Sequence, residues 1–241
     1  MKMFFLTILS VNLFYLTVSA QTAKSAPSLS AADWVKKADQ IRNPSQSFEM
    51  NVKVDDGSSA TEFIVFLKGQ DKTLIVTKSP ARDKGRNMLM LDRDFNAYVP
   101  NLKRSMRLSL AQKLSGQVSN GDISRTRWFG DYSVQLEKDT KDQVQLLLKA
   151  NKDNLTYAAI RLWIDKKNNH PIKAEYLGLN AQTILKRAYF EDYKTMAGAL
   201  RPTTLRIEDV NNKTSYVRIS DMKNKTFDDS FFTVRNMESM K

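Results

Sequence analysis

The single histidine and several paired carboxylates are the residues of this chain whose types fit catalysis. His170 precedes Pro171 after a polar turn, with no serine-bearing elbow or second histidine nearby, which is typical of a surface turn residue. Paired acids could serve a glycosidase, but Asp and Glu at turns and strand ends are common. A hydrolase therefore stays open as the least supported function. The pairs are Asp92/Asp94, Glu191/Asp192 and Asp228/Asp229.

The cysteine and histidine counts exclude much other chemistry. The 241 residues include no Cys and one His, so thiolate nucleophiles, iron–sulfur clusters, disulfides and most zinc or copper sites are excluded. The segment 116–121 lacks the order of strand, glycines and lysine of a phosphate-binding loop. We expect no catalysis, no metal and no cofactor. With 41% hydrophobic and 27% charged residues, the chain is typical of a globular protein with one sizeable core.

The first twenty residues predict a cleaved signal peptide. Lys2 gives a basic start, an apolar run of 16 residues follows, and small side chains precede Gln21. A membrane anchor is the alternative, but the run contains Asn12 and falls short of the roughly 20 residues that span a bilayer. We expect residues 1–20 to be removed, 21–29 to form a linker, and 30–241 to form one soluble domain outside the cytoplasm.

Positive charge is concentrated between residues 78 and 127. This stretch holds eleven Lys or Arg and four Asp, a net charge of +7. Nucleic acid is the usual partner of such a patch, but anionic lipid headgroups or an acidic docking protein fit an exported protein better. A solvated face that aids solubility explains the charge as well. The predicted basic docking face comprises Lys103, Arg104, Arg107, Arg125 and Arg127.

One N-terminal helix and many short strands are the elements that must position the candidate catalytic and basic residues. Ser30 is the expected N-cap of a helix over 30–42, which Asn43-Pro44 ends. From residue 48 onward, period-two alternation between polar turns predicts about a dozen antiparallel strands. A two-turn helix is expected over 109–116, and an irregular connector over 117–131 with a helical turn after Asp122.

A twisted sheet of about a dozen strands curls, and its apolar face then lines a trough. The two predicted helices carry few large apolar side chains, so we expect them to fill the trough only partly. The remaining apolar cavity would suit a carrier of an apolar ligand. A filled barrel or sandwich fits the same alternation.

Several stretches resemble the outer-membrane lipoprotein-sorting proteins of the LolA/LolB-like superfamily. These are SPARDKGRNMLML at 79–91, YVPNLKRSMRL at 98–108, LSGQVSNGDISR at 114–125, RLWID at 161–165 with PIKAEY at 171–176, and YFEDY at 189–193 with LRPT at 200–203. The resemblance runs in unbroken order from about Ser30 to the C-terminus. It is closer to a broader branch than to the lipoprotein chaperone LolA itself.

The resemblance implies an unclosed antiparallel half-barrel of about eleven to thirteen strands, lidded by short helices. It also implies a periplasmic carrier that takes acyl chains of lipoproteins or lipids toward the outer membrane. We expect the carrier to be a monomer. An arginine on the sheet secures the closed lid of LolA, but no residue here aligns to that role. Broader-branch members resemble partners of resistance-nodulation-division lipid exporters, so a lipid-sensing adaptor module is the alternative function. The resemblance does not choose between lipoprotein and free lipid as cargo.

Besides the basic docking face, the predicted site has a cavity and a lid. The predicted cavity residues are Phe48, Met50, Val52, Phe63, Val65, Leu67, Leu89, Leu91, Val134, Leu136, Leu146, Leu148, Ile160, Leu162 and Ile164. The predicted lid residues are Met106, Leu110, Leu114, Trp128 and Phe129. Because the lid would cover bound acyl chains, we expect release to require its movement.

Overall fold

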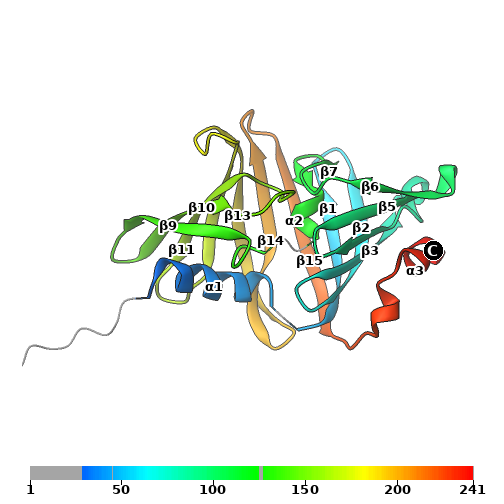
Figure 1. Ribbon diagram of the computed structural model, residues 1–241, viewed down its shortest axis with the longest axis horizontal. Coiled ribbons are helices and arrows are strands. Elements are labelled where there is room, and N and C mark those ends of the chain that lie inside the picture. The colour runs from blue at the N-terminus through cyan, green and yellow to red at the C-terminus, as the bar shows by residue number, and fades with distance from the viewer. Residues whose placement is uncertain (1–28, 45, 125–126, 241) are drawn as a thin grey trace, which may run out of the picture.

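One antiparallel sheet of 13 strands dominates the part of the chain that the structure describes (Figure 1). The structure is a computed structural model that describes residues 29–44, 46–124 and 127–240, so the predicted signal peptide lies outside the described residues. The strands of the sheet are β1 (Phe48–Asp55), β2 (Ala60–Lys68), β3 (Lys72–Ser79), β4 (Met88–Leu91), β5 (Asp94–Val99), β6 (Arg104–Leu108), β9 (Tyr132–Asp139), β10 (Gln143–Ala150), β11 (Ala159–Asp165), β12 (Pro171–Leu177), β13 (Ile184–Met196), β14 (Ala199–Asp209) and β15 (Thr214–Asn224).

The strand order makes an open half-barrel. Neighbours in the chain pair with each other on either side of the β1–β15 pair, which gives the order β6-β5-β4-β3-β2-β1-β15-β14-β13-β12-β11-β10-β9. Strands β6 and β9 are the two free edges and do not pair with each other. The predicted fold class, an unclosed antiparallel half-barrel with eleven to thirteen strands, is confirmed.

The remaining elements are short. They are the helices α1 (Ala31–Arg42), α2 (Asn120–Ile123) and α3 (Val234–Ser239), the 3-10 turns at Ala81–Asp83, Pro100–Leu102 and Asp229–Phe231, and a small hairpin of β7 (Lys113–Ser115) and β8 (Val118–Ser119). None of the helices in the described residues has the length and apolar character needed to cross a bilayer.

Helix α1 begins and ends where the sequence predicts. The Ser30 side chain accepts from the Asp33 backbone N–H, and the Asp33 carboxylate accepts from the Ser30 backbone in return. Asn43, just before Pro44, is the C-cap. The helix packs on β9 and β14 through Trp34, Val35 and Ala38, which are buried.

The two faces of the sheet carry separate cores. The inner face, which faces α1, holds the main core, including Phe63, Val65 and Leu67 of β2. On the outer face, the C-terminal segment with Phe227, Phe232 and Met237 covers apolar side chains of β3 and β4. Because side chains alternate along a strand, β4 gives Met88 and Met90 to the main core and Leu89 to the outer one.

The predicted helix over 109–116 is wrong. Residues 113–115 instead form β7, and Lys113 pairs with Ser119 of β8. The short helix is α2, which ends at Ile123 instead of beginning after Asp122. A two-turn helix gains little by itself because its first turn is costly to nucleate. Tertiary contacts decide instead: the Asn120 side chain donates to the Ser109 carbonyl, and the Gln117 N–H donates to Ser215 Oγ of β15.

Candidate functional site

The connection between the two sheet edges closes the open side of the half-barrel. Because β6 and β9 are opposite edges, the chain between them, residues 109–131, must cross from one to the other. We call residues 109–131 the lid segment; within it, 125–126 lie outside the described residues. Figure 1 shows β7 and α2 on this crossing, over the inner face of the sheet.

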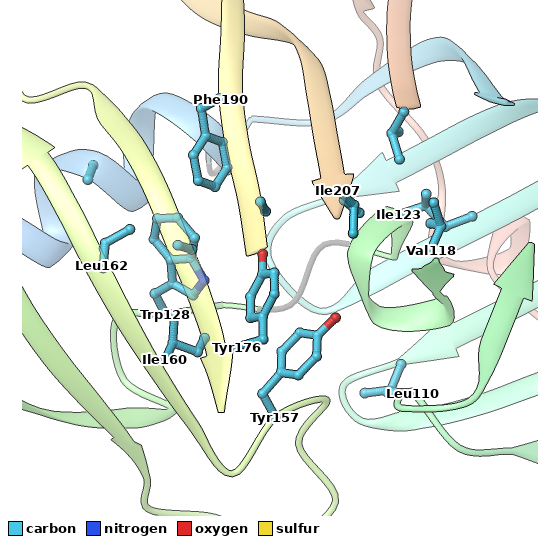
Figure 2. Packing of buried hydrophobic residues seen from close by; sticks show 14 of the residues in the cluster. Leu110, Val118, Ile123, Trp128, Tyr157, Ile160, Leu162, Tyr176, Phe190 and Ile207 are labelled. Atoms are coloured by element: carbon cyan, nitrogen blue, oxygen red, sulfur yellow. The ribbon is translucent and has the colours of Figure 1, made fainter. Parts of the chain in front are cut away.

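The lid segment is apolar on the side that faces the sheet. Its buried side chains join the main core, and Figure 2 shows them together with Ile160, Leu162 and Phe190 of the sheet. Trp128, with 2% of its surface exposed, meets Phe190 edge to face at a ring-centroid distance of 5.6 Å. The buried apolar side chains of the described lid segment are Leu110, Val118, Ile123 and Trp128.

A cavity of about 90 Å³ lies between α1, the lid segment and the sheet. Its apolar lining comes chiefly from β1, β13, β14, β15 and the lid segment. A space of this size holds a few waters or a short piece of hydrocarbon. The apolar lining comprises Phe48, Met50, Val52, Ile123, Trp128, Phe190, Met196, Leu205, Val217, Ile219 and Met222.

The cavity is smaller than the sequence predicts. The prediction of a partly filled trough considered only the apolar side chains of the two predicted helices. Val118, Ile123 and Trp128 of the connector also fill the trough. A cavity of this size has room for only part of a long hydrocarbon chain.

The predicted cavity residues fall into three groups. Phe48, Met50 and Val52 line the cavity. A second group packs in the main core without lining it: Phe63, Val65, Leu67, Val134, Leu146, Leu148, Ile160, Leu162 and Ile164. Leu89, Leu91 and Leu136 need correction: Leu89 and Leu91 belong to the outer core, and Leu136 on the edge strand β9 is 49% exposed. The lining residues from β13, β14 and β15 are not among the predicted cavity residues.

The predicted lid residues are also divided. Leu110 and Trp128 are buried in the main core, and Leu114 packs against it. Met106 and Phe129 are exposed. Met106 stands on the edge strand β6 opposite Ala97, so it belongs to the sheet and not to the lid segment.

The predicted basic docking face is partly neutralised. Arg107 pairs with Asp94, and Arg127 pairs with Asp92 and Asp131. Lys103 and Arg104 are exposed and have no ion pair with any described residue. Arg125 lies outside the described residues.

Several of the residues considered for catalysis have structural partners. His170 stacks on Tyr193 with ring centroids 4.0 Å apart, and burial lowers the pKa of His170. Glu191 pairs with Arg206, and Asp229 with Lys68 and Lys72. No group of three or more His, Cys, Asp or Glu in the described residues is arranged to hold a metal ion.

A buried ion pair attaches α2 to β13. Lys186 Nζ lies 2.6 Å from Asp122 Oδ2, and the side chains are 8% and 1% exposed. The same ammonium donates to the Gln117 carbonyl and to Ser119 Oγ. Asp122 also accepts from the Tyr157 hydroxyl at 2.6 Å. All these donors and acceptors are matched, which a buried charge pair requires.

A second attachment holds the end of the lid segment on α1. The Asp39 carboxylate accepts from the backbone N–H groups of Trp128 and Phe129 at 2.9 and 3.1 Å. Arg42 donates to Asp39 at 2.7 Å, and its guanidinium lies 4.1 Å from the Trp128 ring centroid. Trp128 is thus fixed over the cavity from both sides.

Arg201 on β14 attaches the end of α1 to the sheet. Its Nη1 donates to the carbonyls of Gln40 and Ile41, and its Nε donates to the Met196 carbonyl. The last carbonyls of a helix lack partners within the helix, and a cation there also complements the helix dipole. The lid segment, α1 and the sheet are therefore joined by polar contacts around an apolar space.

Replacing Gly121 with alanine is expected to loosen the lid segment. A β-carbon at this position would lie 1.9 Å from Oγ1 of Thr156, a buried side chain. Gly121→Ala should lower the free energy of unfolding by about 1–3 kcal/mol, measured by urea unfolding. Gly178→Ala is the control, because its β-carbon would meet nothing closer than 3.8 Å. Equal stability of both variants would contradict this packing.

Buried tyrosines predict a loss of stability at alkaline pH. Burial raises the pKa of Tyr157 and Tyr176 above the ordinary value of about 10. The folded state then keeps a proton that the unfolded chain releases, so stability is complete below pH 10 and falls as pH rises above it. Each such tyrosine contributes a slope of about 1.4 kcal/mol per pH unit.

Tyr176→Phe isolates one of these contributions. Between pH 10 and 11 we expect the stability of this variant to fall less than that of the wild type, by about 1 kcal/mol in urea unfolding. At pH 7 the two proteins should be similar, because the Tyr176 hydroxyl has no hydrogen bond to a described residue. Parallel pH profiles would show that Tyr176 ionises as freely in the folded state as in the unfolded chain.

Comparison with known proteins gives one family model and several solved structures. A family model described only as an uncharacterized, "-like" protein matches residues 69–239. The crystal structure of a LolA superfamily protein from Nitrosomonas europaea is similar, with 32% identity and a TM-score of 0.79 over 86% of this chain and 99% of that one. No curated protein matches the sequence.

Two more distant structures share the fold. One is described as an outer membrane lipoprotein-sorting protein domain from Vibrio parahaemolyticus, with 18% identity, a TM-score of 0.71, and coverage of 86% of this chain and 98% of that one. The other is a DUF1329 family protein from Desulfovibrio piger, with 20% identity, a TM-score of 0.73, and coverage of 86% and 97%.

Proposed function

The chain belongs to the LolA superfamily, and from this we propose that it is a periplasmic carrier that binds the acyl chains of lipoproteins or lipids and delivers them toward the outer membrane. The observation that carries the proposal is the apolar cavity under a lid segment that polar contacts hold in place. We expect no catalysis, because the superfamily resemblance implies a carrier and not an enzyme.

The energetics of burial favour an acyl ligand. Each methylene group removed from water contributes about 0.8 kcal/mol, so a chain of some sixteen carbons contributes on the order of 10 kcal/mol before ordering costs. Since a cavity of about 90 Å³ accepts only part of such a chain, we expect binding to displace lining side chains of the lid segment such as Trp128 and Ile123. The lid segment then acts as the gate for loading and release.

Native mass spectrometry of protein purified without detergent from a Gram-negative host tests this proposal. We expect a bound species with the mass of a lipid or lipopeptide, which organic solvent extracts. A protein that is consistently empty and also rejects fluorescent fatty acids would contradict the carrier function.

An adaptor that docks on a resistance-nodulation-division lipid exporter is the second candidate. The observation that favours it is the exposed charge of Lys103 and Arg104, at the start of the edge strand β6, which no described residue pairs. Reversing both charges with Lys103→Glu and Arg104→Glu would abolish partner capture under the adaptor function and leave lipid binding unchanged. Normal capture by this double variant would remove the adaptor from consideration.

A further inference from the structure

The cavity wall contains one charge that no described residue neutralises. Among the described residues, three charged side chains line the cavity: Arg42, Asp122 and Arg201. Arg42 pairs with Asp39 at 2.7 Å, and Asp122 pairs with Lys186 at 2.6 Å. Arg201 forms no ion pair with any carboxylate in the described part of the chain. The wall therefore carries a net positive charge at Arg201.

This charge is held in an unfavourable place. Arg201 is only 6% exposed, and desolvation lowers the pKa of its guanidinium, although an arginine stays charged at neutral pH. Its three hydrogen bonds go to neutral carbonyl oxygens of Met196, Gln40 and Ile41. Nη2 makes no hydrogen bond to any described residue. A buried charge without a counter-ion is costly, and an anion would offset that cost.

Arg201 also stands where the cavity meets the surface. It lines both the inner cavity and an outer groove of about 550 Å³ beside the C-terminal end of α1. The groove contains Lys37 and no acidic residue among those that line it. An amphipathic ligand with its chain in the cavity would place its polar head between Arg201 and this groove.

We infer that Arg201 binds the anionic head of the ligand, a carboxylate or a phosphate monoester, while the acyl chain occupies the apolar cavity. This inference rests on the proposed carrier function and adds the chemical class of the ligand. Nη2 supplies the available donor, and guanidinium groups match carboxylate and phosphate oxygens in geometry. The carbonyls of Gln40 and Ile41 share the same guanidinium, so the bound head lies directly beside the attachment of α1.

Isothermal titration calorimetry with three ligands of equal chain length tests the inference: dodecanoate, dodecyl phosphate and dodecanol. The wild-type protein is expected to bind at least one of the two anions roughly ten- to a hundredfold more tightly than the neutral alcohol. In Arg201→Gln this preference should disappear while the affinity for dodecanol stays within about threefold. Inorganic phosphate alone should not bind, because the acyl chain supplies most of the affinity.

The control is Lys194→Gln, which removes an exposed lysine from β13 and should retain the preference. Equal binding of dodecanol and both anions by the wild type would overturn the inference, even if Arg201→Gln failed to fold, and would leave the carrier function standing. An anion preference that survives in folded Arg201→Gln would also overturn it. Binding of none of the three ligands would instead contradict the carrier function.

Discussion

Replacing Lys186 with methionine is expected to lower the free energy of unfolding by about 3 kcal/mol and to free the lid segment from β13. The variant leaves the Asp122 carboxylate buried without its cation, and breaking a buried pair in this way typically costs 3–5 kcal/mol. We expect the lower end of that range because Asp122 keeps its hydrogen bonds from the Tyr157 hydroxyl and the Ser119 N–H. Urea unfolding measures the loss.

Two further measurements assign this loss to the ion pair. Adding Asp122→Asn to Lys186→Met removes the stranded charge and should restore part of the stability, because residues in one network are not additive. Hydrogen exchange in residues 117–123 should rise in the single variant, since these amides lie on the segment that Lys186 holds. Lys194→Met, at an exposed lysine of the same strand, is the control and should change neither. A neutral effect of Lys186→Met would show that the pair does not hold the lid segment.

Filling the cavity from the sheet side is expected to reduce acyl binding most. Val217 on β15 is buried and lines the cavity. Val217→Phe places a ring in the space that part of the acyl chain needs. If the ring excludes two to three methylene groups, the loss is about 2 kcal/mol, or roughly thirtyfold in the dissociation constant for a fatty acid.

Stability separates blocking from misfolding in this experiment. The cavity of about 90 Å³ beside Val217 provides space for the larger side chain, so we expect only a small change in urea unfolding. Val210→Phe, on the exposed turn after β14, is the control and should bind fatty acid as the wild type does. Unchanged affinity of folded Val217→Phe would mean that acyl chains bind elsewhere.

Local signals in the sequence were sufficient for the strands and for α1. Period-two alternation depends on each strand having one buried face, and the capping pair Ser30 and Asp33 is local to the helix start. The structure of the lid segment depends instead on contacts between residues far apart in the chain. Its hairpin is fixed by contacts such as Gln117 with Ser215, which are 98 positions apart in the chain, so local helix signals at 109–116 were overruled.

The backbone of β13 is distorted at Asp192. Asp192 has a φ of +54°, and Asp192 and the opposite Thr203 are both left out of the pairing, although the register of β13 with β14 is the same on either side of them. Phe190 and Tyr193 both contact the main core although they are three positions apart. A local distortion of this kind follows from packing and cannot be read from alternation alone.

The sequence contains a signal that Arg201 is buried among apolar side chains. Arg201 is in phase with Leu205 and Ile207, two side chains that face the main core. A charged residue in register with an apolar face marks a position where burial must serve a purpose. Its actual partners, the carbonyls that end α1, come from a helix some 160 positions earlier and are visible only in the fold.

Fluorescence quenching by a brominated fatty acid tests most directly whether acyl chains enter the cavity under the lid segment. The chain has three tryptophans, so two variants, each with the other two tryptophans replaced by phenylalanine, retain either Trp128 or Trp163 alone. Trp128 lines the cavity. Trp163 stands on β11 between the inward-facing Leu162 and Ile164 and has Lys173 over its ring. A mid-chain dibrominated stearic acid should quench Trp128 strongly and saturably and leave Trp163 almost unchanged. Equal quenching of both tryptophans, or no quenching of either, would contradict the binding of acyl chains in the cavity.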